Sequence, residues 1–507
     1  MKKTSILLSI AAGFLFASCD MDLAPIGSLD DENAIESPSD LLKDRNGIYN
    51  NIRSVCTGSF IYLSDLQMDQ FMGLIINGNR NGIIAHGNIL SNNSDIESIW
   101  ASYYSCIADA NYLLGRAEIL LEKGGWTQEE VLDINRYIGE TKFARAYYYY
   151  QLIDRFSASY TSANANQEAS GVPLVTVFNP TGDIASYPGR STQAEVYALI
   201  DQDLADAYEA LKAYEAVDNS QLQPMAVYVN TNVITAFQAR LALLRQDWPT
   251  AIAKANEIIN CGVYSLATTA NYAQMWTDDY SDELIFRPIS TNNELGISSI
   301  GGAYISATLT QADYIPTAEV YSSYLSTDVR RSAFFKARSL DANGTSYQCY
   351  CFNKFPGNTA LYTSNVNNLL NMGKPFRLSE MYLILAEASY ENGDEPTANS
   401  ALNTLRSNRI NRYAETTYTG LDLRDQIRTE RAKELIGEGF RLSDLRRWKL
   451  GFTRDGSYPL NPVVTAIFNV VDMQVTYTSD DYRYVWPIPS TEIENNPQLK
   501  GQQNPGY

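Results

Sequence analysis

The sequence predicts a mostly α-helical protein, in which paired helices form a repeat scaffold that carries long loop-rich insertions and a few short strands. Three observations support this fold class. Apolar residues recur at intervals of three and four over several long segments. Two of the helix pairs share the string Asp-x-Pro-Thr-Ala in the same register, at Asp247 and at Asp394. The segments between the helical stretches are rich in Gly, Asn, Ser, Thr and Tyr, which is typical of loops.

Residues 1–18 have the features of an export signal. Two lysines give a basic start, an apolar stretch runs from Ser5 to Phe16, and small residues lead to Cys19. Bacterial lipoprotein processing attaches acyl chains to a cysteine in this position, so we predict that Cys19 is the lipid anchor. The alternative is an ordinary secretory signal that leaves Cys19 as a free thiol. The apolar stretch is shorter than the roughly 20 residues that a membrane-spanning helix needs.

The rest of the chain is predicted to be a short tether followed by one folded domain. Residues 19–40 are acidic, contain two prolines and lack a helical period, so they are expected to link the lipid to the body. Residues 41–507 are expected to form a single helical domain. Insertions near 56–93 and 263–315 are expected to carry the ligand-binding groups, because long connections in a compact protein are usually functional. A third polar segment spans 340–372.

The expected helices follow from the apolar period and from their start signals. Pro249 and Pro396 each follow an aspartate by two residues. Proline fits the first turn of a helix because its missing N–H would have no partner there, and aspartate complements the helix dipole. The two pairs resemble tetratricopeptide hairpins, which must stack to cover their apolar faces, and a third copy begins near residues 143–156. The predicted helices lie near residues 41–53, 94–122, 130–154, 191–213, 231–246, 249–260, 377–392, 396–411 and 421–448.

Composition narrows the class of partner. The chain has 58 acidic and 39 basic residues and a formal net charge of -19, so nucleic acid and anionic lipid surfaces would be repelled. It also has 35 tyrosines and 6 tryptophans beside many amide and hydroxyl side chains. This mixture suits stacking on neutral polar ligands and hydrogen bonding to them. The alternative is a tyrosine-rich helical core.

Most catalytic chemistry cannot be assembled from this sequence. His86 is the only histidine in the chain, which excludes histidine-based triads and two-histidine zinc motifs. Phosphate-binding loops, dinucleotide fingerprints and nucleophile elbows do not occur. The pairs Asp278 with Asp279 and Asp480 with Asp481 could serve a glycosidase, but solvated carboxylates are favoured in so acidic a chain. We therefore predict that the protein is not an enzyme and has no catalytic residue, metal site or cofactor.

Charged residues on helices give the most distinctive stretch, over Arg377–Arg409 and Arg428–Lys449. In the second segment, acidic and basic residues recur at intervals of three and four, which predicts ion pairs between helices. This stretch resembles the hallmark region of the SusD/RagB family of surface nutrient-binding lipoproteins. Residues 98–114 and 485–507, the lipoprotein-like start and the tether are similar to the same family, so the resemblance covers essentially the whole chain.

The resemblance implies a location and partners. It implies a helical layer docked on a SusC-like, TonB-dependent transporter of the outer membrane, with the ligand held between the two. Members resembling SusD mostly bind oligosaccharides and those resembling RagB bind peptides, and the family is not catalytic. We therefore expect a lipid-anchored protein that faces the cell exterior and delivers oligosaccharide to its transporter. Peptide import is the first alternative, a carboxylate glycosidase the second, and a purely structural surface protein without a soluble ligand the third.

The expected binding site uses aromatic rings to cover sugar faces and polar side chains to bind hydroxyls. Each of these aromatics could instead pack in the core. Trp100 and Trp448 are expected in the core because they lie within helix motifs, whereas Trp276 is ambiguous. The predicted ligand-binding residues of the two insertions are Tyr62, Asp65, Arg80, Tyr280, Arg287, Tyr304 and Tyr314.

Overall fold

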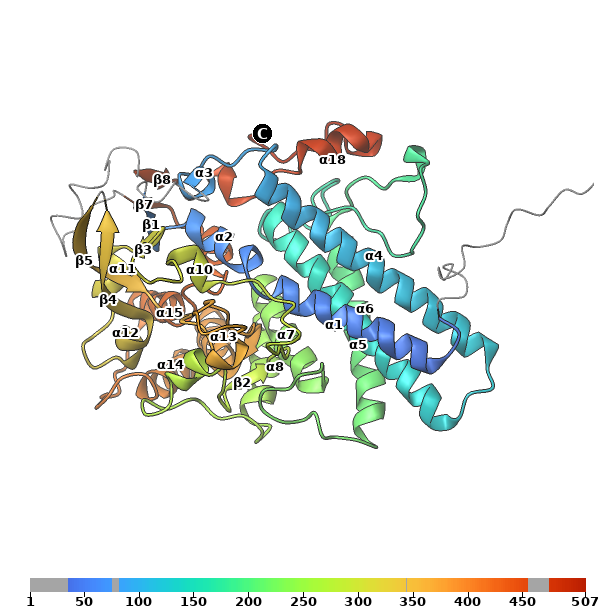
Figure 1. Cartoon of the computed structure of the whole chain (residues 1–507), viewed down its shortest axis with the longest axis horizontal. Coiled ribbons are helices and arrows are strands. Elements are labelled where there is room, and N and C mark those ends of the chain that lie inside the picture. The colour runs from blue at the N-terminus through green and yellow to red at the C-terminus, as the bar shows by residue number, and fades with distance from the viewer. Residues whose placement is uncertain (1–34, 75–81, 343, 455–473) are drawn as a thin grey trace, which may run out of the picture.

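The computed structural model describes residues 35–74, 82–342, 344–454 and 474–507 (Figure 1). Helices dominate it, and its strands are short and pair two by two, as the predicted fold class requires. Cys19 and Arg80 lie outside the described residues. Among the residues that the structure describes, no helix combines the length and the apolar character needed to cross a membrane.

Three long helices form one side of the molecule. These are α4 (Ser94–Lys123), α5 (Gln128–Phe156) and α6 (Gln193–Glu215), and α1 (Pro38–Val55) packs against α4 and α5 (Figure 1). The side chain of Thr127 accepts a hydrogen bond from the backbone N–H of Glu130 and so caps the start of α5. Because α1 begins at Pro38 and Ile35 is already buried, the folded body starts a few residues before the predicted boundary.

The predicted repeat hairpins are confirmed. They consist of α7 (Thr231–Leu244) with α8 (Trp248–Ile259), and of α13 (Leu378–Glu391) with α14 (Glu395–Ser407). The side chains of Asp247 and Asp394 accept hydrogen bonds from the backbone of Thr250 and Thr397, so both start signals act as caps. Helices α8 and α13 pack directly on each other although they are far apart in sequence. Stacking therefore covers the apolar faces that a single hairpin would expose.

The predicted helix over residues 421–448 is wrong as a single element. The structure has α15 (Gly420–Glu434) and α16 (Arg441–Arg447), separated by a turn. Gly437 and Gly439 have φ angles of +76° and +84° in this turn. These values favour glycine and are incompatible with a continuous right-handed helix.

The described parts of the insertions fold into compact structure. Residues 56–93 include α2 (Ser59–Gln67), which we did not predict. The apolar run Glu283 to Pro288 contains strand β2 (Leu284–Phe286), as predicted. The other short elements of the insertions are β1 (Phe71–Gly73), α3 (Gly82–Ala85), α9 (Gln274–Thr277), α10 (Gly301–Tyr304), β3 (Tyr314–Pro316), α11 (Ala318–Ser322), α12 (Val329–Phe334), β4 (Phe335–Ala342) and β5 (Thr345–Phe352).

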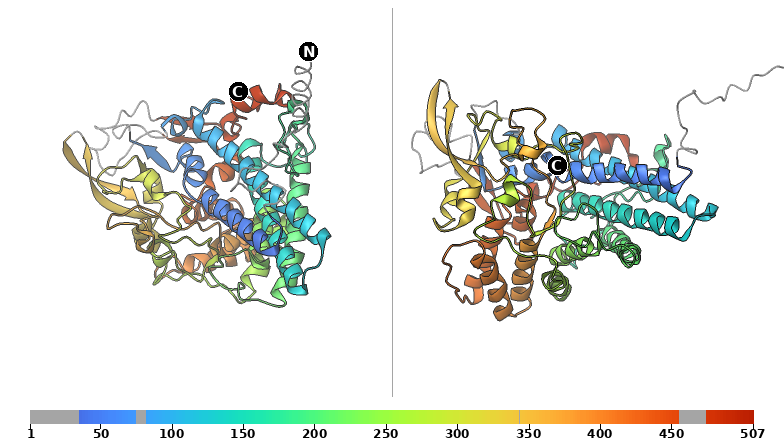
Figure 2. Two further views of the ribbon diagram at one scale, coloured as in Figure 1. Left: turned by 45° about the vertical axis from the view of Figure 1, so that its right-hand side comes forward. Right: turned by 60° about the horizontal axis from the view of Figure 1, so that its bottom comes forward.

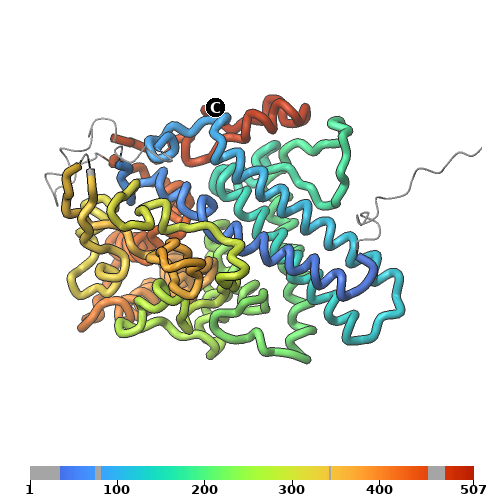
Figure 3. The backbone as a smooth tube through the Cα atoms, viewed as in Figure 1, coloured from blue at the N-terminus to red at the C-terminus, as the bar shows by residue number. Residues whose placement is uncertain are grey.

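All four described strand pairs are antiparallel. They are β1 with β3, β2 with β6 (Phe376–Arg377), β4 with β5, and β7 (Phe452–Arg454) with β8 (Val475–Tyr477). The β4–β5 hairpin projects on the side of the molecule away from α4 and α5 (Figure 2). The C-terminal segment, with α18 (Ser490–Asn495), lies beside the start of α4 (Figure 3), where the N–H of Ser490 donates to the carbonyl of Ser91.

Aromatic side chains build a second core inside the insertions. Tyr304 lies with its ring centroid 4.6 Å from that of Phe71 and 4.7 Å from that of Phe352. Trp276 packs edge-on against Phe334 at 5.8 Å. Trp100 and Trp448 are buried, as predicted. Much of the tyrosine content of the insertions therefore serves packing.

A buried ion network joins the insertions to the C-terminal helices. Glu434 on α15 lies 2.9 Å from Arg330, 2.6 Å from Arg377 and 3.0 Å from Arg409. All four side chains are fully buried. The predicted ion pairs between helices are confirmed at Arg431, which pairs with Asp444, and at Arg447, which pairs with Glu387.

Candidate functional site

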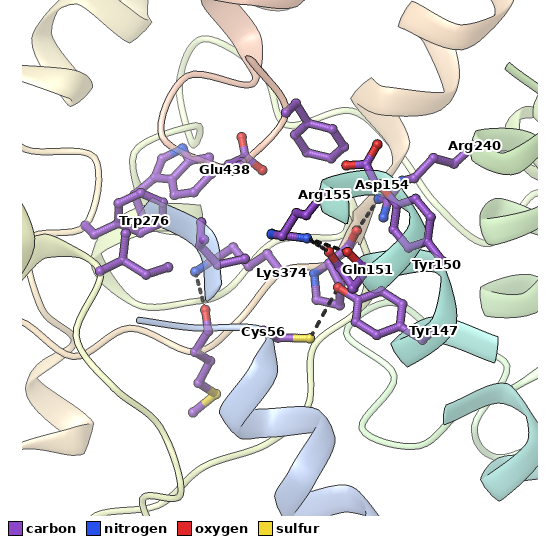
Figure 4. Close-up of a pocket in the computed structure, with 17 residues that line it drawn as sticks. Cys56, Tyr147, Tyr150, Gln151, Asp154, Arg155, Arg240, Trp276, Lys374 and Glu438 are labelled. Carbon is purple, nitrogen blue, oxygen red and sulfur yellow. Dashed lines mark hydrogen bonds between the residues drawn. The ribbon is translucent and has the colours of Figure 1, made fainter. Parts of the chain in front are cut away.

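The first hollow is a central pocket, which lies where α5 and α7 meet the insertions and the turn at 438–440 (Figure 4). Figure 4 shows Tyr147 and Tyr150 on one side of it and Trp276 on the other. Its cavity volume is about 50 Å³. Ligand pockets typically measure about 300 to 1,000 Å³, so the central pocket is too small for a sugar ring.

Most charged groups of the central pocket are already paired, whereas Arg155 binds Gln151 and a backbone carbonyl. The ammonium of Lys374 lies 2.5 Å from Asp279, and that of Lys354 binds the pocket-lining carboxylate of Glu438 at 2.6 Å. Arg240, which also lines the pocket, forms a buried pair with Glu380 at 2.7 Å. We therefore interpret the central pocket as a region where polar side chains connect the helical scaffold to the insertions.

A second hollow, which we call the Tyr104 cleft, is large enough for a ligand. Its volume is about 480 Å³, within the usual range for ligand pockets. It is lined by the segment 173–188, which includes a short 3-10 helix at Ile184–Ser186, by Glu492 and Asn496 at the end of α18, and by Tyr104 of α4. The cleft therefore brings together three parts of the chain that are distant in sequence.

Hydrogen bonds from the helices hold the wall of the cleft in place. The hydroxyl of Tyr104 donates to the carbonyl of Pro173 at 2.8 Å. The amide of Asn111 and the hydroxyl of Tyr149 both donate to the carbonyl of Val175, each at 2.8 Å. These donors tie the segment to α4 and α5, so its outer face is preorganised.

The opposite end of the cleft is tied down as well. Asn496 is buried and its amide donates to the carbonyl of Pro188 at 2.9 Å. The hydroxyl of Tyr187 donates to the carbonyl of Thr181 at 3.1 Å. A bound molecule would thus meet a surface with a fixed shape.

Apolar side chains, among them Leu174 and Val177, and neutral hydrogen-bonding groups line the Tyr104 cleft together. The neutral groups include the hydroxyls of Thr176, Thr181 and Ser186 and the amide of Asn179. Among the described residues that line it, only Glu492 carries a charge. Its Oε2 accepts from the indole N–H of Trp100 at 3.3 Å, and burial raises the pKa of Glu492 above its usual value. The cleft therefore suits an uncharged ligand rich in hydroxyl groups.

The predicted ligand-binding residues of the first insertion occupy different environments. Tyr62 is half-buried and packs against both cores. Asp65 is fully buried and accepts backbone hydrogen bonds from Gly439 at 2.8 Å and from Arg441 at 3.4 Å. The expectation that Asp65 faces a ligand is wrong, because it holds the turn before α16.

In the second insertion, two of the tyrosines predicted to bind ligand are buried. Tyr304 and Tyr314 are each 1% exposed, so the expectation that they offer ring faces to solvent is wrong. Tyr280 is 55% exposed, and the neighbouring Arg287 donates to the carbonyl of Asp279 at 2.9 Å. Trp276, which was ambiguous, is buried. The described members of the predicted set line neither the central pocket nor the Tyr104 cleft.

Sequence reasoning missed the Tyr104 cleft for a clear reason. Its groups come from residue 104, from 173–188 and from 492–496, and no local pattern connects them. The segment 173–188 contains three prolines and no helical period, and it lies between two predicted helices. The length of this connection could have indicated a site, because a long connection in a compact protein is usually functional.

The carboxylate pairs considered for a glycosidase do not form an acid and base pair. Asp279 is buried and bound to Lys374, whereas Asp278 is exposed. Asp481 pairs with Arg483 at 2.6 Å. In the described part of the chain, no group of three or more His, Cys, Asp or Glu side chains is placed to hold a metal ion.

Two family models match the two ends of the chain. The SusD family model matches residues 310–507, and a SusD-like model described as starch-binding and associating with the outer membrane matches residues 29–231. The curated SusD-like protein P25 of Formosa agariphila is 23% identical over 581 residues, covering 100% of both chains. The chain therefore belongs to the SusD/RagB family of helical repeat proteins.

Solved structures show the same fold. A SusD superfamily protein of Bacteroides thetaiotaomicron is 24% identical with a TM-score of 0.76, and the match covers 93% of this chain and 100% of that one. A putative sugar binding protein of Bacteroides vulgatus is 24% identical with a TM-score of 0.74, covering 94% and 99%. A SusD-like carbohydrate binding protein of the same species is 20% identical with a TM-score of 0.72, covering 92% and 98%. The last two are described as binding proteins.

Proposed function

We propose that the protein captures a neutral oligosaccharide in the Tyr104 cleft and delivers it to a SusC-like, TonB-dependent transporter. The observation that carries this proposal is the lining of the cleft, which combines apolar side chains with neutral hydrogen-bonding groups and a single acid, around a volume of about 480 Å³. The family description of starch binding at the outer membrane supports it.

Binding would rest on many weak contacts. Each hydrogen bond from a sugar hydroxyl to groups such as Asn179, Thr176 or Glu492 contributes about 0.5 to 1.5 kcal/mol net, because it replaces a bond to water. Since helices hold the wall in place, little ordering of the protein opposes binding. Such a site binds reversibly, as a protein that passes its ligand on requires.

The surface of the insertions is proposed as a second contact region for the ligand. Tyr62, Tyr280 and Arg287 remain candidates there, because each has at least part of its side chain in solvent. Arg80 is proposed on the sequence alone.

We further propose that acyl chains on Cys19 hold the protein at the outer surface of the outer membrane. The described chain enters the body beside the C-terminal half of α4, where the guanidinium of Arg116 donates to the carbonyl of Ile35 at 3.2 Å. A link of residues 20–34 would join this point to the lipid.

The alternatives fit the Tyr104 cleft less well. A peptide binder would be expected to present paired charges or an edge strand, whereas this cleft has one charged side chain. A glycosidase needs two carboxyl groups flanking the bond to be broken, and Glu492 is the only acid among the described lining residues. We therefore propose binding without catalysis.

Titration calorimetry with neutral oligosaccharides of different linkages tests the proposal. Asn179→Ala should weaken binding about tenfold, since its exposed amide has no hydrogen-bond partner among the described residues to compete with the sugar. Asn219→Ala is the matched control, because Asn219 is also an exposed loop amide and lies outside the cleft. If short peptides bind and every glycan fails, the peptide alternative is correct.

A further inference from the structure

A third hollow, which we call the Arg428 groove, lies between α11, α15 and the end of α16. Its volume is about 290 Å³, close to the lower end of the range for ligand pockets. Arg428 on α15 and Trp448 after α16 line it together with hydroxyl groups. This groove shares no lining residue with the Tyr104 cleft.

Neighbouring arginines of the same helices are bound to acids. Arg431 lies 2.8 Å from Asp444, and Arg441 lies 2.6 Å from Asp69. Arg428 differs, because its side chain makes no hydrogen bond or ion pair with any residue that the structure describes. Its one described cation–π contact is with the ring of Trp448, whose centroid lies 5.2 Å from the guanidinium carbon.

The surroundings of Arg428 make this isolation unfavourable. The side chain is half-buried, and burial lowers its pKa, with a further contribution from the like charge of Arg424 that the carboxylates of Glu387 and Glu391 oppose. A guanidinium that is partly removed from water and makes no direct ion pair gains from any oxyanion that reaches it. Arginine binds a carboxylate or a sulfate through two parallel N–H donors, which gives both strength and orientation.

The acids of the groove are mostly committed elsewhere. Asp69 is engaged by Arg441, and Asp425 pairs with Arg424 at 2.9 Å. Glu319, on α11, is exposed to solvent. The half-buried guanidinium of Arg428 on α15 therefore remains without an ion pair in the groove.

Hydroxyl and amide groups line the same groove. Thr317, Ser323 and Thr429 line the groove with Gln70. An oxyanion receptor with neighbouring hydroxyls matches an acidic sugar residue. We propose that the Arg428 groove binds the carboxylate or sulfate group of an acidic oligosaccharide, a second site apart from the Tyr104 cleft.

This inference rests on the proposed function only in assuming that the ligand is a carbohydrate. The net charge of -19 would repel an anionic ligand at long range. Recognition at Arg428 must therefore act at contact distance, and titrations at one fixed ionic strength are needed to compare ligands.

The test compares two arginines four residues apart on one helix. Purified protein is titrated with a uronic acid oligosaccharide, a sulfated oligosaccharide and a neutral one of the same length. Arg428→Gln should lose about tenfold or more in affinity for at least one acidic ligand and keep its affinity for the neutral one. Arg424→Gln is the matched control and should stay within about twofold, because Arg424 already pairs with Asp425.

Unfolding temperature separates recognition from a structural role. Without ligand, Arg428→Gln should have the same unfolding temperature as the control variant, since no described ion pair is lost. An acidic ligand should raise the unfolding temperature of the wild type and of Arg424→Gln but not of Arg428→Gln. A lower unfolding temperature of ligand-free Arg428→Gln, with unchanged affinities, would show a structural role and overturn the proposal.

The remaining outcomes are distinguishable. If neutral sugars bind and neither acidic ligand does, the groove proposal fails while the proposed function stands. If acidic sugars bind equally well to Arg428→Gln, the site lies elsewhere and the proposal also fails. If acidic peptides bind through Arg428 and acidic sugars do not, the assignment to carbohydrate is wrong.

Discussion

Arg377 donates a hydrogen bond from Nη1 to Oε1 of Glu434 at 2.6 Å, and both side chains are fully buried. This contact joins the strand before the second repeat hairpin to α15. Arg409 and Arg330 bind the same carboxylate. One acid of α15 thus fixes the insertions, the second hairpin and the C-terminal helices relative to one another.

Glu434→Gln should destabilise the protein by about 3 to 5 kcal/mol, because it leaves three buried guanidinium groups with one carboxylate fewer. Urea-induced unfolding followed by circular dichroism measures this loss. Glu415→Gln is the control, since Glu415 is exposed and should change the free energy of unfolding by less than about 0.5 kcal/mol. Equal effects of the two substitutions would show that the network contributes little.

Acid should weaken the same network. Ion pairs with arginine lower the pKa of Glu430 from 4.5 to about 2, and they hold the pKa of Glu434 well below its usual range. Since the unfolded chain binds more protons between these values, the stabilisation is fully present above pH 4.5 and is lost as the pH falls towards 2. Unfolding temperatures measured from pH 6 to pH 2 should fall across this window. A flat profile would contradict the assignment.

Asp65 should have the opposite pH dependence. Burial raises the pKa of Asp65 from 3.8 to about 7, although two backbone N–H groups bind it. The folded protein then holds a proton that the unfolded chain releases, so the contribution of Asp65 to stability falls as the pH rises from 3.8 to 7. Asp65→Asn should remove this loss and gain stability relative to wild type at pH 8, on the order of 3 kcal/mol. If the difference between variant and wild type is the same at pH 5 and pH 8, the prediction fails.

Gly437→Ala should destabilise the turn between α15 and α16. Its φ of +76° is unfavourable for alanine, and an added Cβ would lie 2.7 Å from the ring of Phe352. We expect a loss of about 2 to 4 kcal/mol from strain and overlap together. Gly124→Ala has a similar φ of +63° with nothing within 4 Å, so it should lose only the backbone part, about 1 kcal/mol. Chemical denaturation of both variants separates the two contributions.

The sequence predicted the scaffold well because its signals are local. Aspartate and proline at the starts of α8 and α14 act within one turn, and the apolar period of each helix is visible in a short window. The break between α15 and α16 was missed, since the charged period continues across Gly437 and Gly439 and hides the positive φ angles.

The site was harder to predict because it depends on contacts between distant segments. Tyr304 and Tyr314 were expected at the surface, and they became core residues when β1, β3 and the β4–β5 hairpin packed around them. The Tyr104 cleft depends on hydrogen bonds from α4 and α5 to residues 173–176, which no local pattern reveals.

The most direct test is a crystal structure of the protein with a neutral oligosaccharide that calorimetry shows to bind. The account predicts a sugar in contact with Asn179 and Glu492, with the segment 173–188 unchanged in conformation. A sugar bound only at the insertion surface near Tyr280, with the Tyr104 cleft unoccupied, would contradict it.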